Sequence, residues 1–293
     1  MISEKIIIPP KVASIHDVSG FGRCAQTVIM PTLSALGVQC IPLPTAFLST
    51  HTGGFDGFSF LDLTDEMKKT VRHWNDLNIS FDGVYSGFLG SEEQIDIVSD
   101  FAEECKKKNS KCLFLVDPVM GDDGLKYKTY TDEMCMLMRE LIKNADVITP
   151  NFTEACILTD EEYCEFPDET KQKMVIEKLS RLTDAMIVVT GLIEKQDNSK
   201  KITSILLDEN HNLKKVSCNF IDMNYPGTGD IFSSIVLSML LENKCLFDAV
   251  RVAGEFTSLA AQYTKECKTP TREGLCFEGL LYKLHDMCRD GNI

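Results

Sequence analysis

The chain has 293 residues, 44% of them hydrophobic, which is enough for one large α/β domain with a substantial buried core. Its 30 basic and 44 acidic residues give a net charge of −14. A chain this acidic lacks the general positive charge that attracts nucleic acid or anionic membranes, so we expect neither as a partner.

The twelve cysteines are scattered from Cys24 to Cys288 without a C-x-x-C pair, so their spacing indicates neither a zinc site nor a thioredoxin-like redox motif. The apolar run at residues 6–8 is ended by two prolines and is too short for a signal sequence. No stretch approaches the roughly 20 apolar residues of a membrane span. We expect a protein of the reducing cytoplasm, with most cysteines serving as small core residues.

Strand and helix patterns alternate along nearly the whole chain. The expected strands cover residues 12–15, 38–43, 84–86, 112–116, 147–148 and 186–189, followed by a hairpin of 202–207 and 213–218. The expected helices cover residues 25–36, 64–77, 91–108, 132–143, 168–180, 231–241, 247–263 and 277–287, with Thr64 capping the second and Trp74 in the core. This order predicts one doubly wound, mostly parallel sheet flanked by helices, in a single domain over residues 1–293.

The stretch Tyr225-Pro226-Gly227-Thr228-Gly229-Asp230 precedes an apolar helical pattern. Its glycines let backbone amides turn toward one point, and the start of a helix attracts anions. Asp230 in the first turn would lie beside a bound phosphate and take a proton from an attacking hydroxyl. Because glycines before a helix more often serve a tight turn, this motif indicates phosphoryl transfer only if other stretches agree.

Three more polar stretches follow expected strands, at residues 16–23, 117–124 and 149–154. In open α/β folds ligands bind at the carboxyl ends of the strands, and the acids of the second stretch suit a hard cation. Plainer interpretations stay open: a solvated loop, an Asx turn, and a helix cap with a capping box between Asn151 and Glu154. If an acidic chain binds ATP, the favourable field must be local, so we expect Mg²⁺.

Four stretches taken together resemble the vitamin-B6 kinases of the ribokinase superfamily. They are Ser49-Thr50-His51-Thr52-Gly53, Asp117-Pro118-Val119-Met120-Gly121-Asp122, Thr149-Pro150-Asn151 with Glu154, and Gly227-Thr228-Gly229-Asp230. The spacing agrees from Ser14 to beyond Leu237, which is most of the chain. The resemblance implies a ribokinase-like fold and ATP-dependent phosphorylation of the 5′-hydroxymethyl group of pyridoxal, pyridoxine or pyridoxamine, a step of pyridoxal 5′-phosphate salvage.

The same resemblance implies a role for each motif residue. Asp230 is the general base, and the amides of Gly227, Thr228 and Gly229 form the anion hole. The residues implied near ATP, Mg²⁺ or a monovalent cation such as K⁺ are Asp117 and Glu154 for the metal, with Asp122, Thr149, Asn151 and Thr190. The residues implied near the ring are Asp17, His51, Thr52, Gly53 and Phe88. A homodimer is also implied.

Two positions depart from the vitamin-B6 kinase pattern. Asp17 stands where those kinases have a serine, and it is more similar to the aspartate of the hydroxymethylpyrimidine kinases. An aspartate accepts a hydrogen bond from an amine, which would favour pyridoxamine. Leu48 stands where an aromatic residue often stacks on the ring. A hydroxymethylpyrimidine or hydroxymethylpyrimidine-phosphate kinase therefore stays open as the alternative, with a non-catalytic vitamer or nucleotide sensor as the third interpretation.

Overall fold

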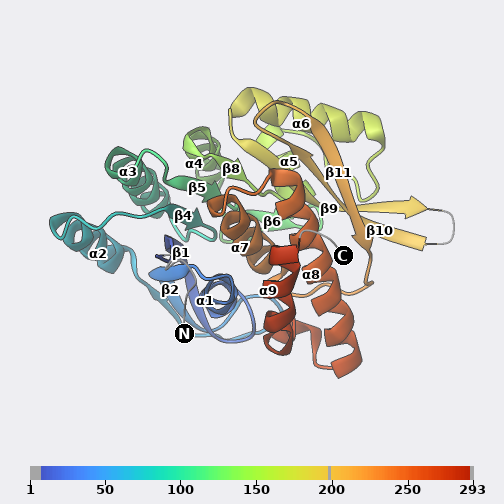
Figure 1. Ribbon diagram of the computed structural model, residues 1–293, viewed down its shortest axis with the longest axis horizontal. Coiled ribbons are helices and arrows are strands. Elements are labelled where there is room, and N and C mark those ends of the chain that lie inside the picture. Colours follow the sequence, from blue (N-terminus) through green and yellow to red (C-terminus); the bar gives the residue numbers. More distant parts are fainter. Residues whose placement is uncertain (1–7, 197–198, 291–293) are drawn as a thin grey trace.

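The computed structural model of the protein describes residues 8–196 and 199–290 and is built on one large sheet (Figure 1). In this part of the chain the strands lie in the order β11-β10-β9-β8-β5-β4-β1-β2-β3. Their bounds are β1 Lys11–Phe21, β2 Gln39–Thr50, β3 Phe60–Asp62, β4 Gly83–Ser86, β5 Leu113–Val116, β8 Val147–Ile148, β9 Met186–Gln196, β10 Ser199–Leu207 and β11 Leu213–Asn219. The strands from β9 through β2 run parallel, whereas β3, β10 and β11 pair antiparallel. The predicted mostly parallel sheet is confirmed.

Helices cover both faces of the sheet, and Figure 1 shows them on either side of the strands. Their bounds are α1 Gln26–Ala35, α2 Thr64–Asp76, α3 Glu92–Lys108, α4 Asp132–Leu141, η1 Ile142–Asn144, α5 Phe152–Thr159, α6 Glu169–Leu182, α7 Thr228–Leu241, α8 Leu246–Cys267, η2 Thr271–Glu273, η3 Glu278–Leu280 and α9 Leu281–Asp290. Buried side chains of α2 to α6 form one hydrophobic core, and those of α1, α7, α8 and α9 form the other. A small hairpin of β6 (Gly121–Asp122) and β7 (Leu125–Lys126) stands apart from the large sheet.

The central strands supply both cores because successive strand residues point to opposite faces. In β5, Phe114 and Val116 join the core with α2 to α6, while Leu115 joins the core with α1, α7, α8 and α9. All three side chains are fully buried, and each stabilises the fold by roughly 1.5–3 kcal/mol relative to exposure. Continuous apolar strands of this kind need cover on both faces, which the two helical layers give.

The first two strands are longer than the sequence predicts. β1 continues through the polar residues up to Phe21, with a bulge between His16 and Val18, and β2 continues to Thr50. The prolines of β2 lie before the short segment that pairs with β3, so that half of the strand has an open outer edge. A missing N–H is tolerated at such an edge. Pairing between β1 and β2 therefore extends both strands through residues whose local sequence indicates loops.

Two predictions about α2 have different outcomes. Thr64 is not its cap, because the helix begins at Thr64 itself and the Thr64 amide donates to Asp62 Oδ1 at 2.9 Å. The Thr64 hydroxyl instead accepts from Gln94 Nε2 at 2.9 Å. Trp74 does pack against the core, in ring contact with Phe81 and Phe101.

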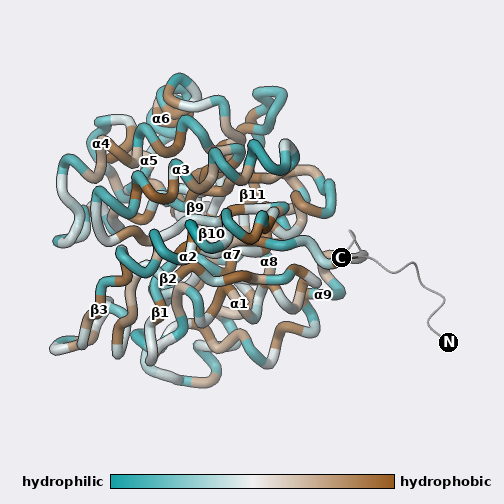
Figure 2. Tube along the Cα trace, turned by 90° about the vertical axis from the view of Figure 1, so that its left-hand side faces the viewer, coloured by the Kyte–Doolittle hydropathy of each residue, from teal (hydrophilic) through white to brown (hydrophobic). Residues whose placement is uncertain are grey.

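Helices α2, α3, α4 and α6 are amphipathic, with an apolar side toward the core and a polar side toward solvent, and Figure 2 shows hydrophobic and hydrophilic residues in turn along the helices. Helix α7 differs, because its residues from Ile231 to Met239 are all buried. Among the residues that the structure describes, no helix is long and apolar enough to cross a membrane.

Candidate active site

The carboxyl ends of the parallel strands and the start of α7 meet at one edge of the sheet. The Asp117 amide donates to the Ser86 carbonyl at 2.8 Å, which joins the ends of β5 and β4. The Ser233 hydroxyl of α7 donates to the Thr149 hydroxyl after β8 at 2.9 Å. A Cβ placed on Gly229 would lie 3.6 Å from Asp117 Oδ2. The structure thus brings together three of the four predicted motifs, those at the ends of β5 and β8 and at the beginning of α7.

The start of α7 has free backbone donors. Gly227 precedes the helix with a φ of 81° and supplies no side-chain cap. The first N–H groups of a helix have no partner within it, so the amides after Gly227 can bind an anion. The Thr228 hydroxyl donates to the Tyr225 carbonyl at 2.7 Å, which turns it away from this role and steadies the loop.

The Asp230 carboxylate lies in the first turn of α7, held by a backbone donor from another segment. The Ala25 amide donates to Asp230 Oδ2 at 2.7 Å, and Oδ1 receives no hydrogen bond from any described residue. Burial raises the pKa of Asp230 to about 6, with Asp17 adding to the rise and the Ala25 amide opposing it. Asp230 is therefore a carboxylate with one oxygen fixed and one free, poised near neutral pH to accept a proton.

Asp117 and Glu154 are buried acids that form no ion pair with a lysine or arginine in the part of the chain that the structure describes. Asp117 is 7% exposed, and its carboxylate has no hydrogen bond or ion pair in the described part of the chain. Burial and the Asp230 charge raise the pKa of Asp117 well above its usual range. Burial and Asp117 raise the pKa of Glu154, against two backbone hydrogen bonds from Asn151 and Met120 that lower it. Buried carboxylates of this kind are stabilised by a bound cation.

No three His, Cys, Asp or Glu side chains of the described residues are grouped so that they could hold a metal ion by themselves. A hard cation such as Mg²⁺ does not need such a group, because it is usually bound by one or two carboxylates together with water and substrate phosphates. The carboxylates of Asp117 and Glu154 have the chemistry that such an ion needs.

Asn151 and Glu154 form the capping box of α5, as the plainer interpretation of this stretch predicts. Asn151 Oδ1 accepts from the Glu154 amide at 2.9 Å, and Glu154 Oε2 accepts from the Asn151 amide at 2.8 Å. Asn151 Nδ2 also donates to the Gly121 carbonyl at 2.8 Å. The pair therefore connects the start of α5 to the β6–β7 hairpin, whatever else it binds.

The β6–β7 hairpin lies over the acids. Asn224 Nδ2, just before the glycine loop, donates to Asp122 Oδ2 at 3.3 Å. The Gly124 amide donates to the Thr153 hydroxyl at 2.9 Å. Burial raises the pKa of Tyr127, with Glu154 and then Asp122 adding to the effect. Sequence reasoning missed Asn224, Thr153 and Tyr127, because nothing in their local sequence indicates these long-range contacts.

Thr149 and Thr190 flank the same edge. Thr149 is buried, and its hydroxyl is the acceptor for Ser233. Thr190 in β9 is half-buried; its amide donates to the Pro150 carbonyl at 2.9 Å, and the residue forms an isolated bridge with Asn151. Both threonines therefore lie beside the start of α5.

His51 is engaged within the protein through both ring nitrogens. Nδ1 accepts from the Gly53 amide at 3.1 Å, so Nε2 carries the proton and donates to the Arg272 carbonyl at 2.6 Å. Thr52 and Gly53 are exposed beside it. Any contact of His51 with a ring ligand is thus limited to the face or edge of the imidazole.

The other residues that the sequence singled out for the ring lie within β1 and β2 and just after β4. Asp17 is 8% exposed and accepts from the Ser19 hydroxyl at 2.8 Å. Burial raises the pKa of Asp17, and the Ser19 hydrogen bond lowers it. Phe88 is half-buried after β4, where its carbonyl accepts from the Thr45 hydroxyl at 3.3 Å, and Leu48 is buried in β2.

Cys24 was not predicted as a site residue, yet it lies next to the acids. Burial raises the pKa of the Cys24 thiol, and Asp230 and Asp17 add to the rise. The thiol is therefore neutral, and it borders the carboxylates without carrying charge.

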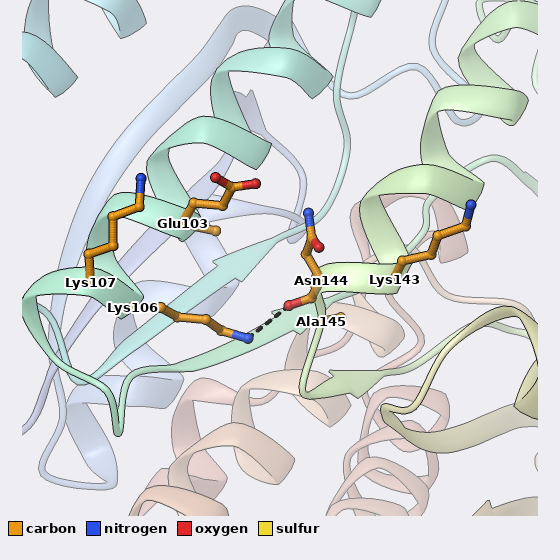
Figure 3. A pocket seen from close by; sticks show the side chains of 7 residues that line it. Glu103, Lys106, Lys107, Lys143, Asn144 and Ala145 are labelled. Carbon is orange, nitrogen blue, oxygen red and sulfur yellow. Dashed lines mark hydrogen bonds between the residues drawn. The ribbon is translucent and has the colours of Figure 1, made fainter.

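A surface cavity at the end of α3 does not belong to this site. Figure 3 shows its lining of Lys106, Lys107 and Lys143 with neighbouring residues. Lys106 Nζ lies 2.9 Å from Asp146 Oδ2 and donates to the Asn144 carbonyl at 2.8 Å. Because Asp146 directly precedes β8, the cavity lies at the amino-terminal edge of the sheet, opposite the acids.

Comparisons with known proteins agree with this geometry. The family model described as phosphomethylpyrimidine kinase matches residues 30–272. Pyridoxal kinase of Dictyostelium discoideum is 28% identical over 78% of this chain and 77% of its own length, and pyridoxal kinase PdxY of Leifsonia xyli is 24% identical over 77% and 79%.

Two solved structures are similar over nearly the whole chain. One is a protein from Bacteroides thetaiotaomicron, proposed to be a phosphomethylpyrimidine kinase and crystallised with pyridoxal; it is 39% identical, with a TM-score of 0.88 over 94% of this chain and 96% of that one. The other is pyridoxal kinase from Lactobacillus plantarum, 27% identical, with a TM-score of 0.84 over 95% and 97%. The expected ribokinase-like fold is confirmed, and the chain belongs to the phosphomethylpyrimidine kinase family.

Proposed function

We propose that this protein is an ATP-dependent kinase that phosphorylates the 5′-hydroxymethyl group of pyridoxal, pyridoxine or pyridoxamine. The proposal rests on three groups that lie together at one edge of the sheet. They are the first amides of α7, the Asp230 carboxylate with a hydrogen bond to only one of its oxygens, and the unpaired carboxylate of Asp117. The pyridoxal kinases among its relatives and the pyridoxal in the Bacteroides structure support a vitamin-B6 ring as the acceptor.

The reaction joins the acceptor oxygen to the γ-phosphorus and breaks the bond to the β-phosphate oxygen, releasing ADP. Asp230 Oδ1 takes the hydroxymethyl proton, and the amides of Gly227, Thr228 and Gly229 stabilise the charge on the transferring group. Asp117 and Glu154 would hold Mg²⁺ directly or through water, and the ion would neutralise phosphate charge.

We assign the other predicted residues to the two ends of the same site. The nucleotide end comprises Asp122, Thr149, Asn151 and Thr190, where a K⁺ ion is also proposed. The ring end comprises Asp17, His51, Thr52, Gly53 and Phe88. The homodimer stays a proposal, which sedimentation velocity tests directly.

A hydroxymethylpyrimidine kinase is the second candidate function, and Asp17 favours it. This carboxylate is almost fully buried, receives a side-chain hydrogen bond from Ser19 and forms no ion pair with any residue that the structure describes. A ring amine would supply the donor that it lacks, and both aminopyrimidines and pyridoxamine carry one. The family model that matches the chain also bears the name of a pyrimidine kinase.

ADP release with a panel of acceptors separates these functions. The panel is pyridoxal, pyridoxine, pyridoxamine, hydroxymethylpyrimidine and its phosphate, each with Mg²⁺ and ATP. We expect the highest kcat/KM with a vitamin-B6 ring; a higher value with a pyrimidine would establish the second candidate. If no acceptor increases ADP release above the ATP-only rate, both kinase assignments are wrong and a non-catalytic sensor is favoured.

Asp230→Asn is the accompanying test of the mechanism. Removal of a positioned general base lowers kcat by roughly 10²- to 10⁴-fold. Asn is nearly the same size and can still accept the Ala25 hydrogen bond, so ATP binding should be retained. Near-normal turnover of this variant would remove Asp230 from the mechanism.

A further inference from the structure

A junction of three backbone segments lies directly behind the proposed catalytic loop. We call it the Arg23 junction, and it consists of Gly22–Ala25, Gly227 and Thr271–Gly274. The Arg23 amide donates to the Glu273 carbonyl at 3.0 Å, and Arg23 Nε lies 2.5 Å from Glu278 Oε1. A segment near the end of the chain is thereby fixed to the loop after β1.

Two glycines permit the close approach at the Arg23 carbonyl oxygen. Gly227 and Gly274 have φ values of 81° and 78°, in the left-handed region that favours glycine. A Cβ on Gly274 would lie 2.5 Å from the Arg23 oxygen, and one on Gly227 would overlap that oxygen even more severely. The junction is therefore a contact of backbone on backbone, with no room for a side chain.

The junction reaches Asp230 through Ala25. The Ala25 amide donates to Asp230 Oδ2 at 2.7 Å, and Ala25 has a φ of 49° and a ψ of −135°, an unfavourable conformation for a residue with a Cβ. Such a conformation persists only when its surroundings impose it. The Arg23 contacts, two residues away in the chain, belong to these surroundings, together with the hydrogen bond from the Ala25 amide to Asp230.

The same junction reaches the ring side of the site through Arg272. Its carbonyl accepts from His51 Nε2 at 2.6 Å, and its guanidinium lies 4.8 Å from the centre of the Phe55 ring. The rings of Phe55 and His51 are themselves in edge contact at 5.0 Å. One short turn thus touches both the segment that holds Asp230 and the segment proposed to hold the ring.

We propose that the turn Thr271–Gly274 is a positioning element that sets the placement of Asp230 relative to the ring-binding segment at His51. It acts through Arg23 and His51 and need not touch substrate itself. This inference rests on the proposed kinase function, because its effect appears as a change in how acceptor and base are aligned.

Gly274→Ala is the direct test, with Gly37→Ala as its matched control. Gly37 follows α1 with a φ of 76°, and a Cβ there would meet nothing within 4 Å, so both variants place a Cβ on a residue with positive φ, but only Gly274→Ala disturbs the junction. For Gly274→Ala we expect kcat to fall roughly 10- to 100-fold and the KM for the acceptor to rise, because misplacement of about 1 Å has effects of this size. The KM for ATP should stay within about twofold of that of Gly37→Ala.

The split between the two KM values separates positioning from a general loss of folded enzyme, which lowers kcat and leaves both KM values unchanged. If Gly274→Ala does not fold, Glu278→Gln serves instead, since it removes only the ion pair with Arg23; a smaller rise in acceptor KM at constant ATP KM is expected. The inference would be overturned if Gly274→Ala had the same kcat and acceptor KM as Gly37→Ala. Where Gly274→Ala does not fold, it would be overturned if Glu278→Gln had the same acceptor KM as the wild type. A wild-type protein without acceptor-dependent turnover would instead overturn the proposed function.

Discussion

At the scale of single residues, the site combines groups that oppose one another energetically. The Asp230 charge raises the pKa of Asp117, and Asp117 in turn raises the pKa of Glu154, while no lysine or arginine of the described residues is paired with these acids. Their burial lowers stability, and proteins retain such an arrangement at functional sites. The acids therefore reveal the site more clearly than any cavity in the fold.

The pKa of Asp230 predicts an acid limit to activity. Because burial raises this pKa to about 6, the carboxylate is ionised above pH 6 and becomes protonated below it. A protonated Asp230 cannot accept the acceptor's proton, so kcat/KM should fall as the pH decreases through about 6. The profile should be measured with both pyridoxine and pyridoxamine, whose own groups titrate differently. If the fall in kcat/KM at acid pH has the same midpoint with both substrates, the titrating group belongs to the enzyme. Full activity at pH 5 would contradict the assignment to Asp230.

Asp117→Asn should stabilise the metal-free protein while it impairs catalysis. The folded-state pKa of Asp117 is raised above the ordinary value of 3.8, so the wild type loses stability as the pH rises from about 4. Removal of this charge should raise the free energy of unfolding by about 1 kcal/mol at pH 8, or Tm by roughly 2–4 °C, with little difference at pH 4.

Thermal unfolding at both pH values, with and without Mg²⁺ and ATP, checks this expectation. Asp96→Asn, at an exposed position of α3, is the control and should change neither Tm nor activity. A lower Tm for Asp117→Asn at pH 8 would show that Asp117 has a stabilising partner in the apo protein.

At the scale of elements, the sequence predicts structure that depends on neighbouring residues, but it does not predict structure that depends on contacts between distant segments. The capping box of α5 is visible in the sequence because both partners, Asn151 and Glu154, belong to one helical turn. The extension of β1 to Phe21 was missed, since its hydrogen bonds are supplied by β2 rather than by local propensity. The same limit applies to the Arg23 carbonyl, whose glycine neighbours are more than 200 residues away along the chain.

Asn151→Ala should separate the capping role of this residue from its link to the hairpin. The change removes the cap and also the hydrogen bond from Asn151 Nδ2 to Gly121, so the β6–β7 hairpin should loosen over the nucleotide end. Loss of an N-cap costs about 0.5–2 kcal/mol of stability. Asp168→Ala is the matched control, because Asp168 caps α6 by accepting from the Lys171 amide at 2.8 Å and does not contact the hairpin.

Both variants should lose similar stability in denaturant titrations, but only Asn151→Ala should raise the KM for ATP. An equal rise in both would assign the effect to general destabilisation of the helices.

At the scale of the whole molecule, the parallel sheet explains why residues distant in sequence form one site. The carboxyl ends of parallel strands share an edge, so the strand order alone predicts that the motifs after β5 and β8 and before α7 converge. The side chains that complete the cluster, such as Ala25 through its amide and Asn224, depend on loop packing. Nothing in periodicity or motif spacing indicates that packing.

The net charge of −14 makes a final prediction about nucleotide binding. The long-range field of the protein repels ATP, so affinity must come from the α7 amides and from a cation at Asp117 and Glu154. ATP with Mg²⁺ at 100 times its Kd should stabilise the protein by about 2.7 kcal/mol. With EDTA the same ATP concentration should give a much smaller shift in Tm. Adenosine, which is uncharged, is the matched control and should shift Tm equally with Mg²⁺ or EDTA. If ATP stabilises the protein to the same extent in EDTA, the two acids do not act through a cation, and Lys126 of the β6–β7 hairpin and Lys128 just after it become the first residues to test.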